Sequence, residues 1–375
     1  MSDSSRATAT STANATAGEA SAVPARAGRY AAIDIGTVTC RMLVADVDAA
    51  GKIAELTCEY AITNLGEGVD ATGRLKPEAI ARVVSTVKGF LAVRDSFITD
   101  DCPHIDTIAI ATSASRDAEN ADEFVDALRQ IGVELTVIPG EREAALSFAG
   151  ASCDFAGEEL MVVDIGGGST EVVVGPAQGS PRWAHSFNIG CRRVTERFLA
   201  GNPPTESELT EARAWIREEM RELFSQAKAE AENAASESAL FGECAKHGAG
   251  KASLEKRLRP TGSALASPAP FRLTAVAGTA TTIVTVRDGI TEYDSSLVHK
   301  QQVTRDQLDA QFASLSDMPL AARQQVPGLD PGRAPVIVAG LLIMQMVMDL
   351  AGVREFTVSE TDILQGIVLA DATGE

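Results

Sequence analysis

The sequence has few aromatic residues and no excess of positive charge. These shortages exclude some classes of function. Its 375 residues include 33 Lys and Arg against 52 Asp and Glu, which gives a formal net charge of −19. Nucleic-acid binding in general needs a basic surface that displaces counterions, so we expect no nucleic-acid partner. An anionic substrate would need local cations or a metal ion to overcome the same repulsion.

Cysteine and histidine are sparse and scattered. The six cysteines form no C-x-x-C pair, and the four histidines show no H-E-x-x-H spacing. This argues against a zinc site and against a disulfide framework. Reduced, isolated thiols are typical of cytoplasmic proteins, and this is the location that we expect.

Long apolar runs are also missing. The most apolar stretch, "VIVAGLLIMQMVM" at 336–348, is shorter than the ~18 to 20 residues of a membrane span and contains Gln345. It predicts a buried helix, and we expect no membrane association. Residues 1–28 are rich in Ala, Ser and Thr without the apolar core of a signal peptide, which predicts a disordered tail.

A hairpin pattern occurs twice in the chain. "AAIDIGTVTCRMLVADV" at 31–47 and "LMVVDIGGGSTEVVVG" at 160–175 share an apolar run, Asp-Ile-Gly, small residues and a second apolar run. Each copy is followed by alternating strand-like and helix-like segments. Two such series predict two related α/β domains that face each other.

Local signals place helices and one insert. Pro77 predicts a helix start, and Thr205 with Glu208 predicts a capping box at the start of another helix. The segment 229–270 lacks periodicity and is rich in Ala, Ser, Gly and Pro. It predicts a flexible surface insert.

The turn of the second hairpin predicts phosphate binding. Three consecutive glycines, Gly166, Gly167 and Gly168, allow the backbone to aim its N–H groups at one point, and Ser169 adds a hydroxyl. The alternative is a tight hairpin that merely tolerates glycine. The flanking Asp and Ser-Thr-Glu residues favour a phosphate site.

Two carboxylates flank this turn. Asp164 ends the first strand and Glu171 lies just beyond the turn. Mg²⁺ prefers one or two carboxylates together with phosphate oxygens and water. The pair therefore predicts a magnesium site, with Mn²⁺ as an alternative ion.

Three further segments carry candidate groups. Gly278 and Thr279 lie in a glycine turn between a strand and a helix, which suits a phosphate. Arg116 follows a buried strand, where a guanidinium can bind phosphate. Glu141 and Glu143 follow another strand, where a carboxylate could activate water. Exposed surface charge is the ordinary alternative for the arginine and the two glutamates.

Taken in order, these motifs resemble the exopolyphosphatase / guanosine pentaphosphate phosphatase family. The resemblance runs from about residue 30 to 370, outside the tail and the insert. The blocks that carry it are "AAIDIGT…RMLVADV", "NLGEGVDATGRL", "ATSASRDAENADEF", "PGEREAALSFAGA", "VVDIGGGSTEVVVG", "FNIGCRRVTERF", "AVAGTATTIVTV", "YDSSLVH" and "VPGLDPGRAPVIVAG".

The resemblance implies a duplicated, actin-like (RNase H-like) α/β fold with the active site in the cleft between two domains. We expect domain I at 29–147, with the C-terminal helix at 360–372 packed against it, and domain II at 148–359. The resemblance also implies the short form of the family, without an appended helical domain.

It further implies Mg²⁺-dependent hydrolysis of a terminal phosphoanhydride of inorganic polyphosphate. The family's catalytic glutamate falls on Glu143. The family's phosphate-binding positions fall on Arg116, Gly166, Gly167, Gly168, Ser169 and Arg193, and its metal-associated carboxylates on Asp34, Asp164 and Glu171. Thr37 of the first hairpin turn, with Gly278 and Thr279 of the third turn, completes the phosphate-binding residues that we predict. A homodimer is compatible with the resemblance.

Three positions depart from the family's usual pattern. Val38, Asn64 and Leu364 stand where the family commonly has an Asn and two arginines. We expect Val38 to lie outside the site, on a wall that sets substrate preference. Two other functions stay open: a guanosine pentaphosphate 5′-phosphatase, and a sensor that binds phosphate or nucleotide but turns it over slowly.

Overall fold

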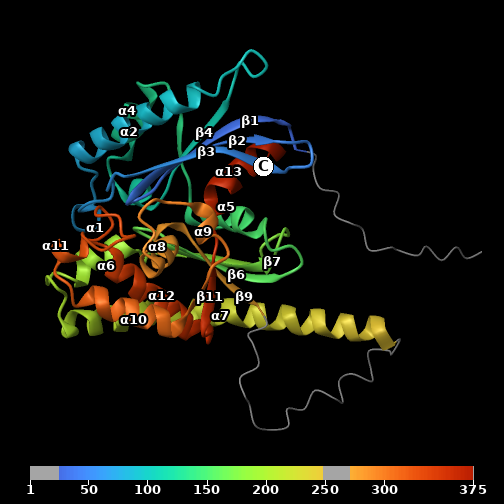
Figure 1. The fold of residues 1–375 in the computed structure, drawn as a ribbon, viewed down its shortest axis with the longest axis vertical. Coiled ribbons are helices and arrows are strands. Elements are labelled where there is room, and N and C mark those ends of the chain that lie inside the picture. Colours follow the sequence, from blue (N-terminus) through green and yellow to red (C-terminus); the bar gives the residue numbers. More distant parts are fainter. Residues whose placement is uncertain (1–24, 248–270, 375) are drawn as a thin grey trace, which may run out of the picture.

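The computed structural model describes residues 25–247 and 271–374, which form two α/β halves, each built on one mixed sheet (Figure 1). The first sheet has the strand order β3-β2-β1-β4-β5, and the second has the order β10-β11-β9-β6-β7-β8. The strands are β1 (Gly28–Ile35), β2 (Thr39–Val47), β3 (Ile53–Ile62), β4 (Asp106–Ala111), β5 (Leu135–Val137), β6 (Glu159–Ile165), β7 (Thr170–Pro176), β8 (Trp183–Phe187), β9 (Arg272–Val276), β10 (Gln302–Thr304) and β11 (Glu355–Val358).

Helices cover both sheets. They are α1 (Val69–Thr72), α2 (Pro77–Asp95), α3 (Ser113–Asp117), α4 (Ala121–Arg129), α5 (Gly140–Ser152), α6 (Cys191–Phe198), α7 (Glu206–His247), α8 (Ala277–Asp288), α9 (Ser295–Val298), α10 (Arg305–Ser316), α11 (Leu320–Arg323), α12 (Ile337–Ala351) and α13 (Ile363–Thr373). The helix starts predicted at Pro77 and at the Thr205–Glu208 capping box are confirmed.

The two sheets repeat one topology. In the first, β1, β2 and β3 form an antiparallel meander, and β4 pairs in parallel with β1. In the second, β6, β7 and β8 form the same meander, and β9 pairs in parallel with β6. The predicted duplicated, actin-like α/β fold is therefore confirmed.

Helices α5 and α13 lie between the two halves and cross closely (Figure 1). A Cβ added to Gly150 would lie 1.7 Å from the carbonyl oxygen of Asp362, and one added to Gly366 would lie 2.0 Å from that of Leu146. Only glycine allows the two backbones to approach so closely. Any movement of one half against the other must therefore bend or shift this crossing.

The C-terminal helix packs against the first sheet. Ile367 and Val368 of α13 share a buried hydrophobic cluster with Tyr30 of β1 and Leu43 of β2. The boundary predicted between residues 147 and 148 falls within α5, a helix that belongs to both halves.

Parts of two segments that we predicted to be flexible are ordered. Helix α7 continues to His247, so the part of the insert from 229 to 247 is helical. Its Ala- and Glu-rich composition favours a helix even without a clear apolar periodicity. At the N-terminus, Arg26 already forms an ion pair with Asp371 of α13 at 3.0 Å. The rest of both predicted segments, 1–24 and 248–270, lies outside the described residues.

The apolar stretch at 336–348 forms most of α12, whose residues from Ile337 to Met348 are all buried. The prediction of a buried helix is confirmed. Across residues 25–247 and 271–374, no helix combines the length and the apolar character needed to cross a membrane.

Candidate active site between two hairpin turns

The hairpin turns of the two halves have the same internal geometry. The N–H of Gly36 donates to the carbonyl of Thr39 at 2.9 Å, and the N–H of Gly166 donates to that of Ser169 at 3.0 Å. Each turn begins just after an aspartate near the end of a central strand. The sequence repeat thus marks a structural repeat.

The two turns face each other across a small cavity. It is lined by the predicted residues Asp34, Thr37, Glu143, Asp164, Gly166, Gly167, Gly168 and Ser169, and its volume is about 50 Å³. The walls touch, since a Cβ added to Gly167 would lie 2.7 Å from Cγ2 of Val38. A water needs ~10 to 15 Å³ of such space, so the cleft is narrow and holds only a few waters.

Three acidic side chains are buried at this cavity or beside it. Burial, opposed by the charge of Arg116 and reinforced by that of Asp164, raises the pKa of Glu143 to about 8. Burial and then the charge of Asp362 raise the pKa of Asp164 to about 6. Burial, followed by the charges of Glu143 and Asp164, raises the pKa of Glu171 well above its usual range. The site therefore holds more negative charge than its own cations balance.

The aspartates of the two hairpins, Asp34 and Asp164, have different partners. Asp34 lies directly opposite Arg41 on the neighbouring strand, whereas Asp164 lies directly opposite Glu171. Opposed residues project from the same face of a sheet. Arg41 Nη2 donates to Asp34 Oδ2 at 2.9 Å, and Nη1 of the same guanidinium also contacts Asp362. Arg41 therefore balances the negative charge on the wall formed by the first hairpin. Among the described residues, no cation stands opposite Asp164 on the wall formed by the second hairpin.

The second wall fits a magnesium ion. Oε2 of Glu171 is buried without a hydrogen-bond partner, while Oε1 accepts from Ser186 at 2.6 Å. Oδ2 of Asp164 accepts from Ser147 at 2.8 Å. Among the described residues no group of three or more His, Cys, Asp or Glu side chains could hold a metal alone. Mg²⁺ needs only one or two carboxylates when phosphate and water supply its other ligands.

Two hydroxyl groups at the cavity lack partners. Oγ1 of Thr37 and Oγ of Ser113 are buried and make no hydrogen bond. Both lie close to Gly168, where an added Cβ would be 2.9 Å from the first and 2.4 Å from the second. Unsatisfied buried donors are costly, and a phosphate oxygen would satisfy them.

Arg116 lies beside the cavity and binds Glu143. Its Nη1 donates to Oε2 of Glu143 at 3.1 Å and to the carbonyl of Ile138 at 3.0 Å. The guanidinium lowers the pKa of Glu143 against the larger effect of burial. Arg116 therefore favours the ionised form of Glu143.

We expect Arg116→Gln to move the acidic limb of the pH–rate profile upward by roughly one pH unit or more, because the carboxylate loses a neighbouring cation. The measurement is kcat/KM against pH for the variant and for Arg129→Gln, a control at an exposed arginine of α4. If Arg116 only bound phosphate, its loss would raise KM at every pH, and the acidic limb of the pH–rate profile would not move.

Gly278 and Thr279 lie at the start of α8 but do not line the cavity. The hydroxyl of Thr279 donates to the carbonyl of Ile165 at 3.2 Å. Gly278 lies against Arg333, and an added Cβ would be 2.2 Å from Nη1 of that guanidinium. Arg333 makes no side-chain hydrogen bond or ion pair within residues 25–247 and 271–374. Sequence reasoning assigned no role to Arg333 or Arg41, although both stand in motifs that it quoted.

Arg193 is tied to both halves. Its Nε donates to the carbonyl of Gly168 at 2.9 Å, its Nη2 donates to Asp117 at 2.5 Å, and its Nη1 contacts Asp70. Asp70 and Asp117 belong to α1 and α3 of the first half. The predicted phosphate ligand thus uses its donors within the protein in this closed arrangement, where it connects the phosphate turn to the opposite wall.

Arg193→Gln removes these bonds, and we expect KM for polyphosphate to rise about tenfold or more, as the loss of charge-assisted hydrogen bonds predicts. The matched control is Arg197→Gln, one turn further along α6, where the guanidinium stacks on Trp215 instead. Equal KM values for the two variants would contradict a role of Arg193 at the cleft.

The three residues that depart from the family's usual pattern have different surroundings. Val38 lines the cavity, contrary to the expectation that it lies outside, and it packs into the hydrophobic core of the second half. Asn64 accepts a hydrogen bond from Arg192 of α6. Leu364 is buried in the cluster that α13 forms with the first sheet.

Comparison with known proteins identifies the family. The Ppx/GppA phosphatase family model matches residues 43–247 and 248–374. "Exopolyphosphatase 2" of Mycobacterium tuberculosis is 34% identical over 358 residues, which cover 91% of this chain and 98% of that protein.

Solved structures agree with this assignment. A crystal structure of an exopolyphosphatase-like protein is similar with a TM-score of 0.75 and 30% identity, covering 92% of this chain and 98% of the other. The Aquifex aeolicus member of the Ppx/GppA family gives 0.65 and 26%, covering 92% and 97%. The chain therefore belongs to the Ppx/GppA phosphatase family and is a phosphoanhydride hydrolase.

Proposed function

We propose that the protein is an exopolyphosphatase that releases orthophosphate from the end of inorganic polyphosphate in a Mg²⁺-dependent reaction. One observation carries the proposal: a buried glutamate, Glu143, lies at the same cavity as a glycine-rich turn and Asp164, and Asp164 stands directly opposite a second buried acid, Glu171, on the neighbouring strand. The name of the Mycobacterium tuberculosis relative supports the choice of polyphosphate.

The terminal phosphate would bind in the turn of the second hairpin. Because Gly167 and Gly168 have no side chains, the opposite wall comes close to the turn, and the free hydroxyls of Thr37 and Ser113 would donate to the phosphate oxygens. Asp164 and Glu171 would hold Mg²⁺, which supplies positive charge to the phosphate oxygens. Such donors stabilise the charge of the transition state because they are already oriented.

Glu143 would take a proton from the attacking water. Its pKa of about 8 is close to neutral pH, the range in which a carboxylate is an effective general base. Arg116 orients the carboxylate through the bond to Oε2. The shortened chain then leaves from the opposite side of the phosphorus.

A phosphate-binding sensor with slow turnover is the second candidate. The apolar Val38 fills the position on the first wall where a donor is common in the family, and the cavity is nearly closed. Tight binding of polyphosphate with negligible release of phosphate would favour this function.

The test is a panel of phosphate-release assays with long polyphosphate, short polyphosphate, guanosine pentaphosphate and ATP, each with and without Mg²⁺. We expect Mg²⁺-dependent release with the highest kcat/KM on polyphosphate. A higher kcat/KM on guanosine pentaphosphate would replace the proposal with a 5′-phosphatase, and no release from any substrate would favour the sensor.

A further inference from the structure

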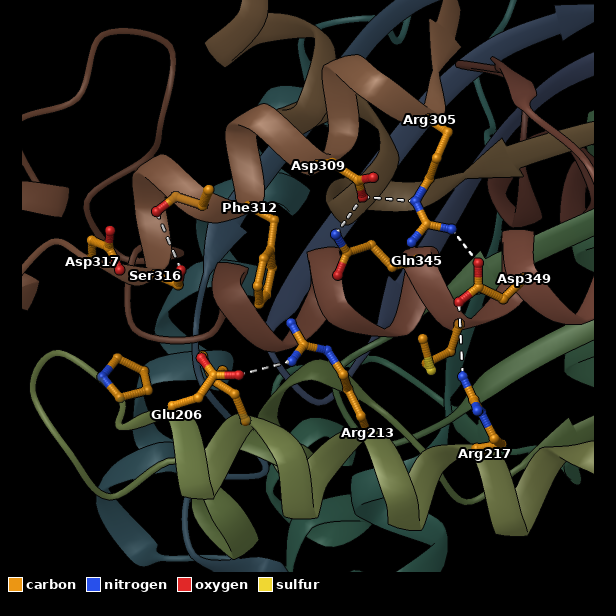
Figure 2. Close-up of a pocket in the computed structure, with 14 residues that line it drawn as sticks. Glu206, Arg213, Arg217, Arg305, Asp309, Phe312, Ser316, Asp317, Gln345 and Asp349 are labelled. Atoms are coloured by element: carbon orange, nitrogen blue, oxygen red, sulfur yellow. Dashed lines mark hydrogen bonds and ion pairs between the residues drawn. The ribbon is translucent and has the colours of Figure 1, made fainter.

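A second cavity lies in the second half, between α7 and α10, with α12 as its floor (Figure 2). Its volume is about 660 Å³, within the range of about 300 to 1,000 Å³ that is usual for small-molecule sites. It shares no lining residue with the cleft between the hairpin turns. We call this cavity the α7–α10 groove.

One side of the groove is a fixed network. Arg305 Nε donates to Asp309 at 2.7 Å, and its Nη1 contacts Asp349 of α12. The buried amide of Gln345 donates to the same oxygen of Asp309 at 2.6 Å. These groups satisfy one another, so they give the groove its shape and offer few free donors.

Two arginines of α7 make only long ion pairs and keep hydrogen-bond donors for a ligand. Arg213 and Arg217 are one turn apart and both line the groove (Figure 2). Their nearest acids are Glu206 at 3.6 Å and Asp349 at 4.0 Å, and neither guanidinium makes a hydrogen bond among the described residues. The ring of Phe312 supports Arg213 at 5.2 Å from its centroid. Guanidiniums oriented in this way suit a phosphate.

The other end of the groove is acidic. Asp317 is exposed, and its carboxylate makes no hydrogen bond or ion pair with any residue that the structure describes. Glu206 lies at the same end, at the start of α7 (Figure 2). The Glu206 carboxylate pairs with the Arg213 guanidinium at 3.6 Å, so of these two acids only Asp317 is unpaired among the described residues. The groove therefore has a free acceptor at Asp317 and cationic donors at Arg213 and Arg217.

We propose that the α7–α10 groove binds a nucleoside 5′-phosphate. The phosphate would bind Arg213 and Arg217. The ring of the nucleobase would stack on one face of the Arg213 guanidinium, and the ring of Phe312 lies at its other face. The N–H groups at the edge of the base would donate to Asp317. A nucleotide matches both ends because it carries an anion at one end and hydrogen-bond donors at the other.

Two other occupants fit less well. A chain of phosphates would place negative charge against Asp317 and Glu206. A second copy of the protein would set one concave groove against another and leave a void, whereas stable interfaces are packed as closely as protein interiors.

The test is calorimetric titration of the full chain with AMP and with GMP. Neither ligand contains a phosphoanhydride, so the proposed hydrolysis at the cleft cannot consume it. We expect at least one of them to bind with Kd below about 1 mM, and adenosine, guanosine and orthophosphate to bind at least about tenfold more weakly. Excess tripolyphosphate, a ligand for the cleft, should leave the binding unchanged.

Arg217→Gln should weaken the binding about tenfold or more, since it removes a charged donor that is 60% exposed and not needed for folding. The matched control is Arg221→Gln, one turn further along α7, which is 67% exposed and outside the groove. Asp317→Ala should weaken nucleotide binding and leave orthophosphate binding unchanged.

Three results would overturn the proposal: no binding of AMP or GMP up to about 1 mM, equal affinity in Arg217→Gln and the wild type, or complete competition by tripolyphosphate. None of them depends on phosphate release, so the outcome is separate from that of the proposed function.

Discussion

Glu143→Gln is expected to lower kcat for phosphate release from polyphosphate by about 10²- to 10⁴-fold, because glutamine cannot take a proton from the attacking water. The buried amide would still reach Arg116, so substrate binding should change little. The measurement is the steady-state rate at saturating polyphosphate and Mg²⁺. The control is Glu141→Gln, an exposed glutamate two residues earlier in the same helix, which should retain the wild-type rate.

Thermal unfolding distinguishes the loss of the catalytic base in Glu143→Gln from misfolding of the variant. The pKa of Glu143 in the fold, about 8, is well above its usual value of about 4.3, so the folded protein holds this proton more tightly than the unfolded chain. The resulting stability is present at low pH and is lost as pH rises toward 8. Glu143→Gln cannot ionise, so without metal at pH 8 its Tm should be higher than that of the wild type by ~2 °C or more. A lower Tm would mean that the variant is damaged.

Asp164→Asn is expected to reduce kcat by about 10²- to 10³-fold and to weaken the activation by Mg²⁺. The substitution removes one charge from the carboxylate pair, while Ser147 keeps a partner at the same position. The activity is measured as a function of Mg²⁺ concentration. Asp154→Asn is the control, since Asp154 lies outside the cavity and pairs with Lys300.

Metal binding gives a readout that is independent of activity. A ligand that binds the folded state raises Tm in proportion to its affinity and concentration. Mg²⁺ should therefore raise the Tm of the wild type and of Asp154→Asn, and raise that of Asp164→Asn less. An equal rise in Tm in all three proteins would mean that Asp164 does not bind the metal.

The fold and the two hairpin turns of the cavity could be predicted because both depend on a repeated local pattern, and Glu143 followed from the family resemblance. The Asp-Ile-Gly hairpin occurs twice, and each copy folds into the same turn with an aspartate near the end of a central strand. A comparison of the two copies would also have predicted the difference between the walls. Arg41 and Glu171 occupy the same position of the repeat, so one aspartate faces a cation and the other a second acid.

Other features depend on contacts that the sequence does not record. Thr279 stands in a motif typical of phosphate turns, yet its hydroxyl bonds to the carbonyl of Ile165. Val38 has no polar group to suggest a place at the site, yet it lines the cavity because the two turns touch there. The family resemblance predicts Arg193 as a phosphate ligand, but in the closed cleft its guanidinium pairs with Asp70 and Asp117.

The most direct test of the account is hydrolysis of long polyphosphate in ¹⁸O-labelled water with Mg²⁺. Attack on the terminal phosphorus predicts that each released orthophosphate carries one ¹⁸O from water and that the remaining chain carries none. Label in the remaining chain, or release of internal fragments, would contradict terminal hydrolysis between the two hairpin turns.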